Sequence, residues 1–247
     1  MQYLRSIVFD VFLYGLILVL GIVFAPFALW SRDGAYFACR TYCRMVLWLL
    51  RTLCGLSTEI RGAVPAGSVI VASKHQSFLD ILMLFNALPR AKFVMKRELR
   101  FVPIFGFYAM RLGSTPVARG KRSAAMKAMV EHVEADASEA DQIVIYPQGT
   151  RVAPGAYLPY KVGAGVLYQR LGRVCVPAAT NVGVFWGRRA LLKRPGVAVL
   201  EFLPPMPAGL PIAQFMAELE AAVERESDRL MREAGFAPER SARAEGA

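Results

Sequence analysis

The chain has few residues with which to hold a metal ion or to build a disulfide framework. Its 247 residues include only two histidines and four cysteines. Four cysteines are too few to staple a chain of this length, and a metal site built on two of them would lack further ligands. We therefore expect no metal, and reduced thiols in a main domain that faces the cytosol. All four lie in apolar stretches, where cysteine is usually an inert core residue: Cys39, Cys43, Cys54 and Cys175.

Charged residues are also scarce, at 20% of the chain against 55% hydrophobic residues. This composition excludes a disordered chain and is too apolar for an ordinary soluble enzyme. The net charge is +11, and residues 74–122, with ten basic and two acidic side chains, carry most of the surplus. An anionic partner is expected, either a phospholipid surface or nucleic acid. Because no nucleic-acid module signature accompanies the basic stretch, we favour an anionic membrane and expect no nucleic acid.

Residues 11–30 form an apolar run of twenty residues without a formal charge. Twenty helical residues at about 1.5 Å each match the hydrocarbon thickness of a bilayer. Pro26 would kink or end such a helix. A buried core helix is the alternative, but the run is apolar on every side, which favours membrane contact.

The next segment, residues 35–56, is apolar with a narrow basic stripe that suits the surface of an anionic bilayer. On a helix the three arginines of the stripe fall within about 40° of one another. We predict a membrane-embedded two-helix hairpin over residues 1–58, with a short turn at residues 31–34; a two-pass span stays open. The stripe consists of Arg40, Arg44 and Arg51.

After Gly62 apolar runs of strand length alternate with helical patterns. This alternation predicts an α/β domain over residues 59–236, with a mostly parallel central sheet flanked by helices. Residues 237–247 are expected to form a flexible tail. The predicted strands are 69–72, 92–95, 143–146, 174–178 and 197–202, and the predicted helices are 78–87, 121–135, 162–171 and 211–234.

One histidine lies five residues before a carboxylate, as His75 and Asp80, directly after a predicted strand. On a continuous helix this spacing separates the two side chains by about 140°. If the helix starts at Ser77, however, His75 lies in the preceding turn and can fold back towards Asp80. The carboxylate would then orient the imidazole of a general base. The alternative is a helix cap formed by Ser77 and Asp80, beside a loop histidine without chemistry.

Two further polar segments follow. Residues 146–151 come directly after a predicted strand; Gly149 lets the backbone approach a ligand, and Arg151 offers a planar fork suited to phosphate. Read alone, this segment is also compatible with a plain turn. Residues 113–122 place several cations just before a predicted helix, where anions bind.

In this order and spacing, the segments resemble the glycerolipid acyltransferase family, closest to its bacterial 1-acyl-sn-glycerol-3-phosphate (lysophosphatidic acid) acyltransferases. The similarity covers roughly residues 60–205. The chain departs from the family at Gln148, where a Glu is usual, so a role of this position as an ionic anchor is in doubt. The matching residues are His75 and Asp80 (the His-x4-Asp motif), Arg119 (second block), Gly149, Thr150 and Arg151 (third block) and 176–178 (fourth block).

The resemblance implies transfer of an acyl chain from acyl-CoA or acyl-carrier protein to the 2-hydroxyl of lysophosphatidic acid, giving phosphatidic acid in phospholipid biosynthesis. It implies His75 as the base, Asp80 as its orienting carboxylate, and no cofactor or metal. The expected location is the inner (cytoplasmic) membrane, with the catalytic domain facing the cytosol. Backbone N–H groups near Gly149 are expected to receive the oxyanion. The implied substrate-binding residues are Arg119, Lys121, Gln148, Gly149, Thr150 and Arg151.

Three alternatives remain open. The acceptor could be a different one within the same family of acyltransferases, such as a lyso-ornithine lipid or glycerol-3-phosphate itself. The protein could be a non-catalytic membrane protein that binds anionic lipid, although such binding does not require the His75 and Asp80 pair. A thioester hydrolase would release the acyl chain without an acceptor.

Overall fold

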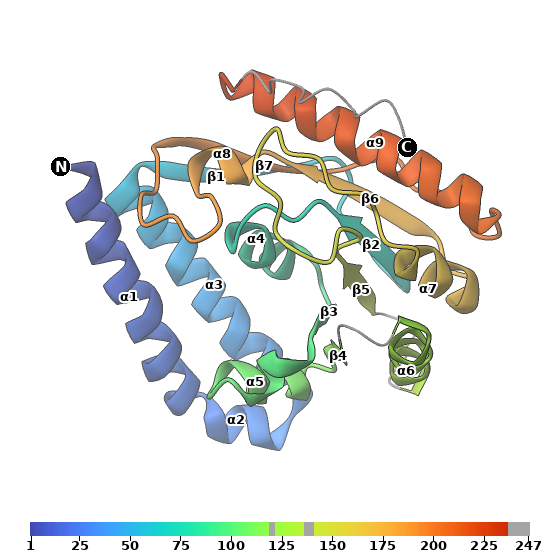
Figure 1. Cartoon of the computed structure of the whole chain (residues 1–247). Coiled ribbons are helices and arrows are strands. Elements are labelled where there is room, and N and C mark those ends of the chain that lie inside the picture. The colour runs from blue at the N-terminus through green and yellow to red at the C-terminus, as the bar shows by residue number, and fades with distance from the viewer. Residues whose placement is uncertain (119–121, 136–140, 237–247) are drawn as a thin grey trace.

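A seven-stranded sheet forms the centre of the computed structural model, which describes residues 1–118, 122–135 and 141–236 (Figure 1). The strand order is β1-β7-β6-β2-β5-β3-β4. Every pairing is parallel except that of β6 with β7, which confirms the predicted mostly parallel α/β architecture. The strands are β1 (Leu56–Arg61), β2 (Val69–Ser73), β3 (Ala91–Lys96), β4 (Thr115–Val117), β5 (Gln142–Ile145), β6 (Cys175–Thr180) and β7 (Gly196–Phe202).

Helices cover both faces of this sheet (Figure 1). Helices α3 and α4 pack on one face, with α1 on the outer side of α3, and α6, α7 and α9 pack on the other face. The helices are α1 (Gln2–Val23), α2 (Ala25–Trp30), α3 (Arg32–Cys54), α4 (Leu79–Ala87), α5 (Phe105–Arg111), α6 (Arg122–Ala135), α7 (Gly163–Leu171), α8 (Val182–Phe185) and α9 (Ile212–Glu233), with a 3-10 turn η1 at Arg97–Phe101.

The central strands are buried on both faces because their side chains alternate between two cores. Val71 of β2 lies in register with Val144 of β5 and Val176 of β6, and all three pack on the side of α4. Their neighbours Ile70 and Ile143 point to the opposite core, under α9. The same alternation carries on past the end of β2 and decides which way the site residues point.

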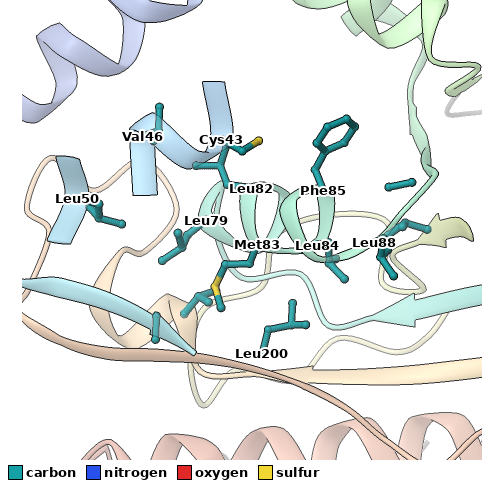
Figure 2. Close-up of a cluster of buried hydrophobic side chains, with 14 of the residues drawn as sticks. Cys43, Val46, Leu50, Leu79, Leu82, Met83, Leu84, Phe85, Leu88 and Leu200 are labelled. Carbon is teal, nitrogen blue, oxygen red and sulfur yellow. The ribbon is translucent and has the colours of Figure 1, made fainter. Parts of the chain in front are cut away.

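Helix α3 packs against α4 rather than lying apart from the domain (Figure 2). Cys43, Val46 and Leu50 of α3 face Leu79 and Leu82 of α4. All five side chains are almost fully buried. Burial of a Leu or Val side chain contributes about 1.5–3 kcal/mol, so α3 is part of the core that supports the site.

The predicted pairing of two N-terminal helices is confirmed, because α1 packs along α3, but the turn and the basic stripe differ from the prediction. The apolar run breaks at Phe24, where Pro26 sits in the first turn of a separate short helix, α2. No four-residue turn follows, because Ser31 caps α3 directly and accepts a hydrogen bond from the Gly34 amide. Arg40, predicted in the exposed basic stripe, instead turns inward and donates to the carbonyl oxygens of Leu88 and Pro89. Arg44 and Arg51 are exposed as predicted.

By length and composition, α1 could cross a membrane, and it alone has this property among the helices of the described part of the chain. One narrow face of α1, with Ser6, Phe9 and Leu13, is buried against the protein. Most of its other large apolar side chains are exposed. Apolar exposure on this scale is unusual for a soluble surface and is consistent with membrane association.

Most of the predicted elements are present, with ends within two residues of the predicted ones. Strand β1 was not predicted, because its sequence Leu-Ser-Thr-Glu-Ile-Arg lacks an apolar run, and neither was the three-residue strand β4. The short elements α5, α8 and η1 were not predicted either. The domain boundary at residues 58/59 stays a prediction, and the tail at 237–247 lies outside the described residues.

Candidate active site

The predicted site residues that the structure describes lie together at one edge of the sheet. Residues 74–80 follow β2, and residues 146–151 follow β5. Because β2 and β5 are parallel neighbours, both segments leave the sheet at its carboxyl edge. The amide of Val152 donates to the carbonyl oxygen of His75 at 2.8 Å, which joins the two segments directly. Ligand sites in open α/β sheets commonly lie at this edge.

The predicted contact between His75 and Asp80 is formed. Nδ1 of His75 lies 2.9 Å from Oδ1 of Asp80. Helix α4 begins at Leu79, one residue later than the predicted helix and two residues later than the start at Ser77 that the spacing argument assumed. The Leu79 amide donates to the Ser77 hydroxyl. His75 therefore lies before the helix and folds back over its first turn, as the spacing argument required.

Asp80 is a fully buried carboxylate with a complete set of donors. Its Oδ2 accepts from the backbone amides of Gln76 and Ser77, both at 2.8 Å. Its Oδ1 accepts from the Tyr146 hydroxyl at 3.0 Å and faces His75. An ionised carboxylate only accepts hydrogen bonds, so the shared proton of the pair lies on Nδ1 of His75. The imidazole then keeps an unprotonated Nε2, which is the form that a general base needs.

Tyr146 is a site residue to which the sequence alone assigned no role. Its ring stacks on the imidazole of His75, with 3.9 Å between centroids and 17° between planes. Burial, followed by the negative charge of Asp80 and the hydrogen bond to it, raises the pKa of Tyr146 well above 10. The hydroxyl therefore stays a donor at any physiological pH. Its place directly after a predicted strand and before the third motif was the only available signal.

The loop after β5 places Arg151 beside the pair. Gly149 adopts φ 69°, a left-handed conformation that glycine takes without strain, and this turns the loop. The Gly149 amide donates to the Tyr146 carbonyl at 2.8 Å, so this N–H is not free to receive the oxyanion expected near Gly149. Thr150 and Arg151 are half-buried. Among the described residues, Arg151 has no hydrogen-bond or ion-pair partner. Its guanidinium is therefore available to bind an anion.

Gln148 lies in a buried polar cluster behind the loop. Its Nε2 is 3.5 Å from Oε1 of Glu224, a residue of α9. Glu224 also forms an ion pair with Lys74 and accepts a hydrogen bond from the Tyr160 hydroxyl at 3.0 Å. We refer to Lys74, Gln148, Tyr160 and Glu224 as the Glu224 cluster. Sequence patterns gave no sign of it, because 76 residues separate Gln148 from its partner.

Two of the predicted substrate-binding residues, Arg119 and Lys121, lie outside the described residues. No group of three or more His, Cys, Asp or Glu side chains that could hold a metal ion occurs in residues 1–118, 122–135 and 141–236. Burial raises the pKa of the Cys39 and Cys175 thiols to about 12, so both stay protonated and unreactive, as expected for core cysteines.

A mostly parallel α/β sheet whose carboxyl edge carries a partly exposed histidine paired with a buried aspartate defines a class of protein able to activate a hydroxyl group. The comparison with protein families is more specific. Residues 57–181 match the Acyltransferase family, and the chain belongs to that family. The matched region contains His75, Asp80, Gln148 and Arg151. The protein is therefore an acyltransferase.

Named relatives are similar over most of the chain. The 1-acyl-sn-glycerol-3-phosphate acyltransferase of Pseudomonas aeruginosa is 28% identical over 190 residues, covering 76% of this chain and 74% of the relative. The human 1-acyl-sn-glycerol-3-phosphate acyltransferase alpha is 29% identical over 169 residues, covering 66% of this chain and 60% of the relative. The chain thus spans less than two thirds of the human protein.

A solved structure shares the fold. The crystal structure of the 1-acyl-sn-glycerophosphate (LPA) acyltransferase from Thermotoga maritima superposes with a TM-score of 0.76 at 17% identity. The match covers 93% of this chain and 99% of that chain. It therefore includes the N-terminal helices as well as the sheet.

Proposed function

We propose that this acyltransferase moves an acyl chain from a thioester donor to the free 2-hydroxyl of lysophosphatidic acid and so makes phosphatidic acid. The relatives named above support this acceptor. The observation that carries the chemistry is the hydrogen bond from Nδ1 of His75 to the carboxylate of Asp80, which leaves Nε2 with a free electron pair. The donor is acyl-CoA or acyl-carrier protein.

In the proposed reaction, Nε2 of His75 takes the proton of the acceptor hydroxyl as its oxygen attacks the thioester carbonyl. The new C–O bond forms a tetrahedral intermediate. The C–S bond then breaks, and the leaving thiolate takes the proton back from His75. Asp80 stabilises the imidazolium while it exists, and Tyr146 holds both groups in place. General base catalysis of this kind contributes about 10²–10⁴ in rate.

Arg151 is proposed to bind the phosphate of the acceptor. It lies in the loop that Val152 ties to His75, so a bound phosphate would bring the glycerol hydroxyl near the base. A guanidinium matches phosphate in a bidentate manner that a lysine cannot copy. Arg119 and Lys121 are proposed as further phosphate contacts, on the family resemblance alone. Gln148, Gly149 and Thr150 shape the loop that carries Arg151.

The proposed location is the inner (cytoplasmic) membrane, with the sheet domain in the cytosol. The exposed apolar side chains of α1 and α2 support membrane contact, among them Trp30 at 92% exposure. A membrane-bound enzyme of this kind can take a lysolipid directly from the bilayer. The orientation follows from the reduced-thiol argument and from a cytosolic donor.

The test is mass spectrometry of the lipids formed from purified protein, acyl-CoA and a panel of lysolipid acceptors. We expect phosphatidic acid from lysophosphatidic acid, and at least a hundredfold loss of this product in His75→Ala, which remains folded because His75 lies at the edge of the core. Product from lyso-ornithine lipid alone would reassign the acceptor. Acyl release without acceptor would indicate a hydrolase, and lipid binding without turnover a non-catalytic protein.

A further inference from the structure

The Glu224 cluster lies behind the candidate active site and includes the neighbour of its proposed base. Lys74 directly precedes His75 and follows the last residue of β2. Side chains alternate along β2, so Lys74 points to the face under α9, while His75 points away from it. Lys74 is only 2% exposed. A buried ammonium group is costly unless a carboxylate pairs with it.

Glu224 supplies that carboxylate. Its Oε2 is the ion-pair partner of the Lys74 ammonium, and its Oε1 accepts from Tyr160 and lies near Nε2 of Gln148. Burial and the charge of Glu224 both raise the pKa of Tyr160, so its hydroxyl stays a donor. A single side chain of α9 therefore contacts the segment that carries His75 and both ends of the 146–161 loop.

The other side chains on the same face of α9 reinforce this arrangement. Ser227 accepts from the Thr180 amide, and the sulfur of Met231 accepts from Gln76, which neighbours His75. Glu220 accepts from the hydroxyl of the exposed Tyr157 in the outer part of the loop, and its charge also acts on Tyr160. Positions 220, 224, 227 and 231 share a helix face because they are spaced by three and four residues. Glu224 alone on this face provides a charge to a buried cation of the site.

We propose that Glu224 is a positioning residue, whose carboxylate holds Lys74 and the 146–161 loop together and so aligns His75 with Arg151. Gln148 is neutral, so the cluster has one negative and one positive charge. Replacing Glu224 by Gln leaves the cation unpaired, and replacing Gln148 by Glu adds a second anion. Either change should displace the loop. Exchanging the two residues restores one carboxylate within the same cluster, because the two side chains are 3.5 Å apart.

This inference rests on the proposed function for its activity assay, and we therefore pair that assay with amide hydrogen exchange. The variants are Glu224→Gln, Gln148→Glu and the double exchange Q148E/E224Q. Glu220→Gln is the matched control, since it removes a tyrosine-bonded carboxylate from the same helix face but leaves the ion pair of Lys74 intact. Misplacement of catalytic groups by about 1 Å can cost about 10² in rate, so we expect kcat to fall about tenfold or more in each single variant.

We expect the double exchange to recover kcat to within about threefold of wild type, and Glu220→Gln to stay within about twofold. Peptides of residues 147–161, whose Val152 and Lys161 amides are bonded in the native loop, should exchange faster in Glu224→Gln and at the wild-type rate in the double exchange. Unchanged kcat and unchanged amide hydrogen exchange in Glu224→Gln would overturn the proposal. A Q148E/E224Q variant that recovers neither property would overturn it as well. If Glu224→Gln does not fold, the double exchange decides alone. A wild-type protein inactive on lysophosphatidic acid would refute the proposed function, while the exchange data would still test Glu224.

Discussion

The substitution Asp80→Asn tests the proposed proton transfer with almost no change of shape. Oδ2 of Asp80 accepts from two backbone amides, and Oδ1 faces His75 and Tyr146. An asparagine has one accepting oxygen and one donating NH2 group in place of two accepting oxygens. These backbone amides belong to Gln76 and Ser77, just before α4, and can only donate. The amide oxygen of the introduced side chain must therefore face them, and its NH2 group must face the imidazole.

An NH2 group opposite Nδ1 reverses the tautomer of His75. Nδ1 becomes the acceptor and the ring proton moves to Nε2, where it blocks uptake of the substrate proton. The stabilising charge beside the imidazolium is lost as well. Because general base catalysis contributes about 10²–10⁴, we expect the rate of transfer to fall by a factor in that range. The Tyr146 hydroxyl can rotate to accept from the amide, so the fold should survive.

The assay is the initial rate of phosphatidic acid formation, with circular dichroism as a check on folding. Asp141→Asn is the matched control, because Asp141 is a buried carboxylate paired with Lys92 at the opposite edge of the sheet, before β5. This variant should be less stable than the wild type. At temperatures well below its unfolding midpoint, its rate of phosphatidic acid formation should equal that of the wild type. An Asp80→Asn protein that retains more than a tenth of the wild-type rate would refute the tautomer argument.

The same geometry supports three more predictions. Tyr146→Phe removes one charged hydrogen bond to Asp80, worth about 1.5–3 kcal/mol, and should lower kcat about tenfold. Because the pKa of Tyr146 is well above 10, the ratio of wild-type kcat to variant kcat should stay constant between about pH 6 and 9, and a ratio that changes with pH would contradict the assignment of Tyr146 as a constant donor. Arg151→Ala should lower kcat/KM for lysophosphatidic acid at least tenfold and Arg151→Lys should recover only part, whereas an equal loss on a lysolipid without a phosphomonoester would indicate a structural role. The substitutions Val19→Asp and Ile22→Asp place charges on the exposed face of α1 and should abolish binding to anionic vesicles in a flotation assay, while activity on detergent-dispersed acceptor is kept. Full vesicle binding by this variant would disprove membrane contact through α1.

The contact between His75 and Asp80 could be predicted because it is local. The two residues are five positions apart, and one assumption about the start of the helix decided whether their side chains meet. The actual start at Leu79 differs by two residues without changing that outcome. The turn at Gly149 could likewise be predicted from residue chemistry at the end of a strand, whereas the role of Arg151 stays a prediction. These inferences needed no knowledge of how distant segments pack.

Tyr146 and Glu224 could not be predicted in this way. The hydroxyl of Tyr146 reaches Asp80 only because β5 and β2 are neighbours in register, and the sequence does not state which strands pair. Glu224 belongs to a helix that reads as an ordinary amphipathic one, with several glutamates along it. Which of these faces a buried lysine depends on the rotation and register of α9 over the sheet. The same reason explains the error at Arg40, whose partners lie 48 and 49 residues away.

The two ends of α1 are fastened differently, and this determines how the site would meet a membrane. At the N-terminal end, Asp10 forms an ion pair with Lys193, which is 1% exposed and lies over the rings of Phe9 and Trp186. Ser6 accepts from the Lys193 amide at 3.0 Å. A helix fastened by a buried ion pair cannot swing away from the domain without leaving a buried charge unpaired, which costs about 3–5 kcal/mol.

The other end of α1 is fastened through α5. The Tyr108 hydroxyl donates to the carbonyl oxygen of Gly21 at 3.0 Å, and Ile104 packs so closely on Gly21 that a Cβ atom there would come within 2.3 Å of it. The exposed apolar face of α1 is therefore held at a fixed position relative to the sheet. If that face enters a bilayer as proposed, the depth of the active site is set by the fold and not by a flexible linker. The acceptor hydroxyl of a lysolipid lies near the headgroup. The rigid attachment of α1 to the domain therefore holds the base at the depth of that hydroxyl in every turnover.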